Sequence, residues 1–251
     1  AADWMCAAQK ENGAWETGNS LFADQQATVY NVKAAWGLGL FGLLVENEQY
    51  VQCASKAADY ALLRQEDNGW FDECCLTDPS KPLLHTLAYT MQGLLELGLI
   101  TGNRDYVLGA RRTADSLIQI LQPSGFLPGR LDRNFSPAVS WCCLTGSAQT
   151  AIVLFQLFKL TGRQQYRDAA DILLEYLLAR HDIRSDHPTV RGGVPGSWQV
   201  NGAYGRLMVL NWATKFFVDA MIEKKLIDDP DSSISSHPID MTRFKPGDLA
   251  N

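Results

Sequence analysis

The stretch Gln65-Glu66-Asp67-Asn68-Gly69-Trp70-Phe71 decides the fold, because the chain contains related copies of it. An earlier copy, QKENGAW, runs from Gln9 to Trp15, and a looser copy contains Gly125-Phe126. An aspartate precedes each copy at a fixed distance, and the interval from Asp3 to Asp59 equals the interval from Asp59 to Asp115. A fixed period of this length predicts a repeat protein.

Tyrosines outside these stretches keep the same register. Tyr50 and Tyr106 are separated by the same interval as the aspartates, and Tyr166 follows after a slightly longer one. The apolar residues before each tyrosine recur at helical spacing, so each unit is predicted to be a helical hairpin. We expect eight helices, over residues 1–9, 28–46, 49–65, 84–101, 104–121, 144–161, 164–180 and 209–225.

The first helix of each hairpin carries a face that is unlike a dry core. Positions 21, 17, 14 and 10 before each tyrosine share one helical face. The residues at these positions are Val29, Lys33, Trp36 and Leu40, then His85, Tyr89, Gln92 and Glu96, then Thr145, Gln149, Ile152 and Gln156. Two of the three sets are largely polar, which predicts a hydrated cavity lined by the first helices. The long connections, 66–83, 122–143 and 181–208, all follow second helices and are expected at its mouth.

Composition narrows the class of protein. The chain has 251 residues, of which 46% are hydrophobic and 20% charged, so we expect one globular domain over 1–227 and an irregular tail over 228–251. A net charge of -6 argues against nucleic acid as a partner. No apolar run reaches the roughly 18 residues that a membrane span needs. Six cysteines without a small disulfide scaffold predict reduced thiols and a cytoplasmic protein.

The repeat resembles a known family. QKENGAW fits the QxxxGxW repeat of squalene and terpene cyclases, and QEDNGWF is a close variant. The chain therefore resembles the α/α-toroid superfamily, which also includes protein prenyltransferases and many glycosidases, sugar epimerases and polysaccharide lyases. The resemblance implies an all-α fold built from a ring or arc of helical hairpins. The acid motif DxDD of the cyclases has no counterpart, and the zinc site of prenyltransferases cannot be placed.

A second likeness covers the C-terminal part. The segments 193–198 and 211–217 are similar to uncharacterised toroid proteins associated with bacterial polysaccharide genes, which implies sugar chemistry. A closed toroid of this family has twelve helices, whereas eight are predicted here. We therefore expect missing hairpins before Ala1, closure with fewer units, or a second subunit such as the partner in a homodimer.

Two constellations could carry catalysis. Asp72 and Glu73 follow Gly69-Trp70-Phe71, and Glu16 occupies the place equivalent to Asp72 in the earlier copy. Two carboxylates across a cleft could act as general acid and base on a glycosidic bond, and the alternative is solvated loop acids or helix caps.

His85 and Tyr89, one helical turn apart, form the second constellation. They suit proton abstraction next to a uronic carboxylate, with Arg130 or Arg133 neutralising the acid group. The alternative is a hydrogen-bonded histidine at a helix start and a tyrosine that packs inward.

Further residues are candidates for substrate or metal contacts. Lys33 and Gln149 lie on the polar face, and four aromatic residues could stack on sugar rings: Trp141, Trp198, Tyr204 and Trp212. The pairs Cys74-Cys75 and Cys142-Cys143 are distantly similar to zinc sites of some arabinofuranosidases, but CxxC spacing is absent, so buried thiols are preferred and no metal or cofactor is expected.

These features together predict a carbohydrate-active enzyme. It would act on a polysaccharide or a uronic-acid-containing glycan, as a lyase, an epimerase or a hydrolase. One alternative is a protein like the terpene cyclases or prenyltransferases. Another is a non-catalytic toroid that binds a glycan or a partner protein as a scaffold, which becomes the better interpretation if the acidic pair, His85 and Arg130 do not converge in one pocket.

Overall fold

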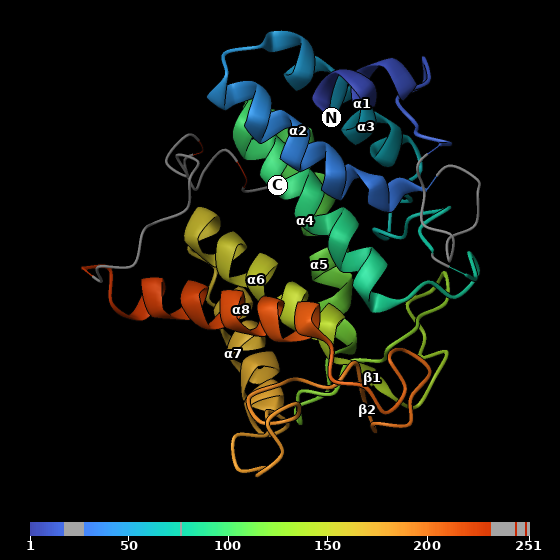
Figure 1. The fold of residues 1–251 in the computed structure, drawn as a ribbon. Helices are drawn as coiled ribbons and strands as arrows, with labels where there is room; N and C mark the ends of the chain where they lie inside the picture. The colour runs from blue at the N-terminus through green and yellow to red at the C-terminus, as the bar shows by residue number, and fades with distance from the viewer. Residues whose placement is uncertain (18–27, 76, 232–243, 245–248, 250–251) are drawn as a thin grey trace. The chain divides into compact units, whose positions relative to one another are not determined.

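The computed structural model describes residues 1–17, 28–75, 77–231, 244 and 249, and Figure 1 shows its helices along the chain. The described residues form eight α-helices: α1 (Ala2–Ala8), α2 (Val32–Leu44), α3 (Glu48–Leu63), α4 (Leu84–Thr101), α5 (Arg104–Ile120), α6 (Leu144–Thr161), α7 (Gln164–Leu178) and α8 (Asn211–Asp228). A short 3-10 helix, η1 (Val29–Asn31), precedes α2, and strands β1 (Cys142–Cys143) and β2 (Ser197–Trp198) pair antiparallel. The prediction of an all-α chain with eight helices at these places is confirmed.

The chain divides into two compact units. The first comprises Ala1–Pro82, Thr86–Ser116 and Ile239–Asn251, and the second comprises Leu83–His85 and Leu117–Pro238. Within the first unit, α2 and α3 form a hairpin and α1 packs on α3. Within the second, α6 and α7 form a hairpin and α8 packs on α6. The predicted boundary at residue 227 stays a prediction, since most of the expected tail lies outside the described residues.

The repeated motif builds the same turn after each second helix. Gly13, Gly69 and Gly125 have φ angles of 90°, 87° and 84°, a left-handed conformation that glycine adopts at little cost. A Cβ at any of the three would overlap the backbone of the next second helix, at Lys56, Arg112 and Ile172 respectively. Lys56 and Arg112 are separated by the interval of the repeat, and Ile172 follows after a slightly longer interval. The three tyrosines have the same spacing. The tyrosine register is therefore confirmed.

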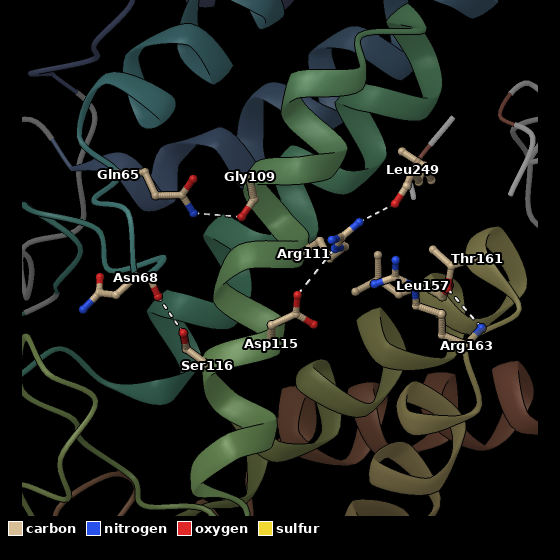
Figure 2. Close-up of polar contacts among 10 residues, drawn as sticks. All are labelled: Gln65, Asn68, Gly109, Arg111, Asp115, Ser116, Leu157, Thr161, Arg163 and Leu249. Carbon is tan, nitrogen blue, oxygen red and sulfur yellow. Dashed lines mark hydrogen bonds and ion pairs between the residues drawn. The ribbon is translucent and has the colours of Figure 1, made fainter. Parts of the chain in front are cut away.

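The glutamine of the motif clamps one hairpin to the next. Gln65 Nε2 donates to Gly109 O on α5 at 2.8 Å, as Figure 2 shows, and Gln9 Nε2 donates to Cys53 O on α3 at 2.8 Å. Cys53 and Gly109 are themselves separated by the interval of the repeat. Gln9 Nε2 also donates to Gly13 O, within its own copy of the motif, at 3.0 Å. The bond that recurs, however, is the one that crosses to the following hairpin.

The period of the aspartates and tyrosines has the same origin. Tyr106 OH donates to Asp59 Oδ1 at 2.6 Å, which joins α5 to α3, and Tyr50 OH donates to Asp3 Oδ1 at 2.5 Å, which joins α3 to α1. Both residue types are thus needed once per hairpin, to bind the second helices to one another.

Most of the polar positions predicted to line a hydrated cavity are buried, and the cavity itself stays a prediction. On α4 the exposed fractions are 7% for His85, 4% for Gln92 and 0% for Glu96. On α6, Thr145 and Gln149 are 0% exposed. Burying polar side chains is unfavourable unless they find hydrogen-bond partners, so this face is the part of the fold that most needs a functional explanation.

Candidate functional site

His85 is the second residue of α4, and the segment Leu83–His85, which belongs to the second unit, packs closely on the start of α6. Gly146 makes this approach possible, because a Cβ there would come within 2.7 Å of His85 N. The loop before β1 fixes the same turn of α4, since Leu84 N–H donates to Gly129 O at 3.0 Å. The side chain of His85 is thereby directed at Gln149, one turn further along α6.

The contact between His85 and Gln149 determines the state of the imidazole. His85 Nδ1 lies 2.6 Å from Gln149 Oε1. A carbonyl oxygen can only accept, so Nδ1–H donates and the neutral ring carries its lone pair on Nε2. Gln149 therefore orients a histidine whose Nε2 is the basic atom.

Two buried polar atoms in the first two turns of α6 lack partners in the part of the chain that the structure describes. Gln149 Nε2 and Thr145 Oγ1 have no hydrogen-bond partner among the described residues, although both side chains are fully buried. Thr145 and Gln149 are four positions apart and lie on one helical face. An unsatisfied buried polar group costs about 1–3 kcal/mol, so native proteins usually complete such positions with water or a ligand.

Aromatic rings lie beside His85. The ring centroid of His85 is 5.6 Å from that of Tyr204 and 6.4 Å from that of Phe216. Trp212 Nε1 donates to Tyr204 OH at 2.9 Å, and 44% of Trp212 is exposed. Four of the residues predicted from the sequence, His85, Gln149, Tyr204 and Trp212, are thus brought together.

Two more predicted residues belong to the same unit. Arg130 is half-buried and pairs with Leu83 in an antiparallel bridge, which places it beside the chain that leads into His85. Trp141 packs on Gly129 and Gly202, where a Cβ would come within 2.3 Å and 2.9 Å of its ring. The alternative arginine, Arg133, is exposed.

Lys33 and Tyr89 form a separate cluster in the first unit. Lys33 Nζ donates to Gln92 Oε1 at 2.6 Å and lies 4.2 Å from the ring centroid of Trp36 and 5.5 Å from that of Tyr89. Burial raises the pKa of the Tyr89 phenol above its ordinary value, so this tyrosine is protonated at neutral pH. The cluster is a cation held by an amide and aromatic faces.

The predicted acidic pair is also in the first unit, and its members differ. Glu73 is half-buried: its Oε2 accepts from Tyr60 OH at 2.5 Å and its Oε1 is 3.2 Å from Arg64 Nη1. Burial, followed by the hydrogen bond to Glu73, raises the pKa of Tyr60 to about 12. Asp72 is exposed, and Glu16 makes an ion pair at 3.2 Å with Lys10 at the surface.

The adjacent cysteines are buried thiols. Cys74 Sγ lies 3.3 Å from Thr90 Oγ1, and Cys142 Sγ lies 3.2 Å from Ser147 Oγ. Burial raises the pKa of Cys74 to about 12, of Cys142 to about 11 and of Cys143 to about 12. Within the described part of the chain, no group of three or more His, Cys, Asp or Glu side chains is placed to hold a metal ion.

Sequence reasoning missed two residues of the second unit. Phe216 lies four positions after Trp212 on α8. This helical spacing could have predicted that Phe216 shares a helix face with Trp212. Arg180 packs against Trp198, the fourth of the predicted aromatic residues, with its guanidinium carbon 5.3 Å from the ring centroid. The position of Arg180 after the end of α7 gave no comparable signal.

Comparison with solved structures identifies the fold. An unsaturated glucuronyl hydrolase from Bacillus sp. GL1 matches with a TM-score of 0.72 at 16% identity, over 91% of this chain and 67% of that one. An unsaturated glucuronyl hydrolase specific for heparin gives 0.72 at 13% identity, over 94% and 68%. A cellobiose 2-epimerase from Spirochaeta thermophila gives 0.58 at 16% identity, over 90% and 67%. At these identities the likeness establishes the α/α-toroid fold.

Searches of protein-family models and of curated proteins match nothing in this chain. The likeness to squalene and terpene cyclases therefore stays a prediction. Among the described residues, no helix combines the length and the apolar character needed to cross a bilayer.

Proposed function

We propose that this chain is a carbohydrate-active enzyme that processes a uronic-acid-containing glycan, with His85 as the residue that transfers a proton. The observation that carries the proposal is the pair of His85 and Gln149: the Gln149 amide nitrogen is buried without a partner among the described residues, and the His85 ring lies beside Tyr204. Matching structures of glycan-processing enzymes support the same class of substrate.

The geometry favours proton abstraction over other sugar chemistry at His85. A uronate carries an acidified hydrogen at C5, next to its carboxylate. His85 Nε2 has the lone pair that can accept this proton, because Gln149 holds Nδ1–H. Gln149 Nε2 would donate to a sugar oxygen, Arg130 would neutralise the carboxylate, and Trp212 would stack on the ring. This arrangement suits a lyase or an epimerase.

Hydrolysis is the second candidate. Two of the matching structures are unsaturated glucuronyl hydrolases, and Glu73 is a half-buried carboxylate held by Tyr60 and Arg64. A hydrolase needs two carboxylates on either side of the bond, and Asp72 is the predicted partner.

One experiment separates these reactions. Uronate oligosaccharides are incubated with the protein in D2O, and the products are analysed by mass spectrometry and ultraviolet absorbance. β-Elimination gives an absorbing unsaturated product, epimerisation gives deuterium at C5, and hydrolysis gives new reducing ends with neither mark. We expect one of the first two, abolished in His85→Asn and retained in His187→Asn, an exposed histidine of the 181–208 loop.

Two outcomes would refute the role of His85. If no oligosaccharide is altered, or if His85→Asn turns over as fast as the wild type, His85 is not the proton-transfer group. Binding without turnover would support the non-catalytic scaffold instead.

A further inference from the structure

A cavity of about 560 Å³ lies in the second unit beside the end of α7. Its lining includes Arg180, Asp182, Arg184 and Trp198. Its volume is within the range of about 300–1,000 Å³ that is typical of small-molecule sites. None of its lining residues belongs to the group around His85, so the cavity requires its own explanation.

Arg180 is held in place at this cavity, and one of its N–H donors has no partner among the described residues. Its Nη1 donates to Tyr176 O at 2.7 Å, and its guanidinium carbon lies 3.2 Å from the ring centroid of Tyr176 and 5.3 Å from that of Trp198. Its Nε is buried and has no hydrogen-bond partner among the residues that the structure describes. A guanidinium held against aromatic rings is pre-organised to receive an anion.

The charges of the lining are unbalanced. Neither Arg180 nor Arg184 makes an ion pair with a carboxylate in the described ranges, whereas arginines elsewhere do, such as Arg64 with Glu73. The one acidic residue of the lining, Asp182, uses its Oδ1 to accept from the backbone N–H groups of Arg184, at 2.9 Å, and Ser185, at 3.0 Å. The cavity therefore offers two cationic side chains to a ligand.

We propose that this cavity binds a carboxylate-bearing sugar unit of the glycan, with its ring on Trp198 and its carboxylate on Arg180 and Arg184. Aromatic faces suit sugar rings, and the fork of a guanidinium matches a carboxylate with two hydrogen bonds. A second cavity of about 320 Å³ shares Arg180, Asp182 and Trp198 with the first, so the binding surface continues past the tryptophan. The inference rests on the proposed function and adds to it a second site, selective for acidic units.

The test measures binding by isothermal titration calorimetry. The probes are a glucuronate-containing tetrasaccharide and its carboxyl-reduced, neutral counterpart. We expect the acidic probe to bind more tightly to the wild type, and Arg184→Gln to weaken it on the order of tenfold, as loss of a charge-assisted hydrogen bond does. Arg180→Lys keeps the positive charge but loses the planar pair of N–H donors that matches a carboxylate, so it should weaken binding of the acidic probe as well.

Arg206→Gln is the matched control, because Arg206 is an exposed arginine of the same loop that lines neither cavity. It should bind the acidic probe like the wild type. Equal affinity for the two probes, or unchanged affinity in both Arg184→Gln and Arg180→Lys, would overturn the inference. If turnover depends on His85 but the arginine variants bind the acidic probe as tightly as the wild type, the proposed function stands and this site is refuted. If binding depends on the arginines but no turnover is detected, the enzymatic function is refuted and this site stands.

Discussion

The two polar atoms of the Gln149 amide have different surroundings, and both follow from its place on α6. Its Oε1 fixes the ring of His85, and its Nε2 is left buried without a partner in the described structure. An apolar residue would fill this core position at lower cost, since a half-satisfied buried amide is unfavourable. We interpret the amide as a binding group that a sugar oxygen completes.

Gln149→Met tests this interpretation. Methionine fills a similar volume but offers neither the acceptor for Nδ1 nor the donor for the sugar. We expect kcat/KM on the glycan to fall about 10- to 100-fold, because the imidazole is no longer held with its lone pair on Nε2. Steady-state kinetics measures the effect, with Gln165→Met, an exposed glutamine of α7, as control. Unchanged kinetics in Gln149→Met would show that the amide has no part in the reaction.

The sequence allowed His85 and Gln149 to be predicted because a polar face on an otherwise apolar helix is conspicuous. Tyr204 and Trp212 were predicted as aromatic residues at the mouth that could stack on sugar rings. Phe216 and Arg180 were not found, because a phenylalanine in a helix and an arginine after a helix end are ordinary; only the packed structure shows what they contact.

At the scale of elements, the repeated turn is what joins the hairpins. Gly69 exits α3 with φ of 87°, and its Cα lies so close to α5 that a Cβ would be 2.7 Å from Arg112 C. The glutamine clamp of Gln65 to Gly109 and the bond from Ser116 Oγ to Asn68 O, at 2.6 Å, hold the same turn against α5, as Figure 2 shows. Helices and hairpins follow from sequence periodicity, but these contacts between hairpins do not.

Gly69→Ala should therefore destabilise the protein strongly. We expect the free energy of unfolding to fall by about 2–4 kcal/mol, the sum of a left-handed alanine and a backbone overlap. Gly37→Ala is the control, since Gly37 lies within α2 with nothing within 4 Å of its added Cβ, and it should stabilise the protein by about 0.5–1 kcal/mol. Chemical denaturation measures both changes, and equal stability of the two variants would contradict the role assigned to the turn.

For the molecule as a whole, we expect the free energy of unfolding to fall at alkaline pH because several thiols are buried. Burial raises the pKa of Cys74 to about 12 and of Cys142 to about 11, from an ordinary value of 9.0. Above that ordinary value the unfolded chain loses these protons while the folded chain keeps them. The free energy of unfolding should therefore fall as pH rises from about 9 toward 11, by up to about 1.4 kcal/mol per pH unit for each thiol.

Urea denaturation at several pH values between about 8 and 10 checks this prediction. Cys142→Ala should show a shallower decline than the wild type, because one of the titrating groups is gone. A decline of the same slope in both proteins would mean that the Cys142 thiol is not protected from ionisation in the folded state.

The fold was predictable from the sequence because every hairpin repeats the same contacts. The contacts of the buried polar face were less predictable. Spacing placed Lys33, Tyr89 and His85 on one face, but only the structure shows that Lys33 contacts Gln92 and Tyr89 and that His85 contacts Gln149. Long connections such as 181–208 position Tyr204 and Trp198 through turns that periodicity does not encode.

The proposed function requires that the buried polar face around His85 binds the sugar on which the enzyme acts. A crystal structure of His85→Asn with a uronate tetrasaccharide tests this requirement most directly. We predict a sugar oxygen within hydrogen-bond distance of Gln149 Nε2, with the ring beside Tyr204 and Trp212. A bound tetrasaccharide that leaves Gln149 Nε2 and Tyr204 untouched would contradict it.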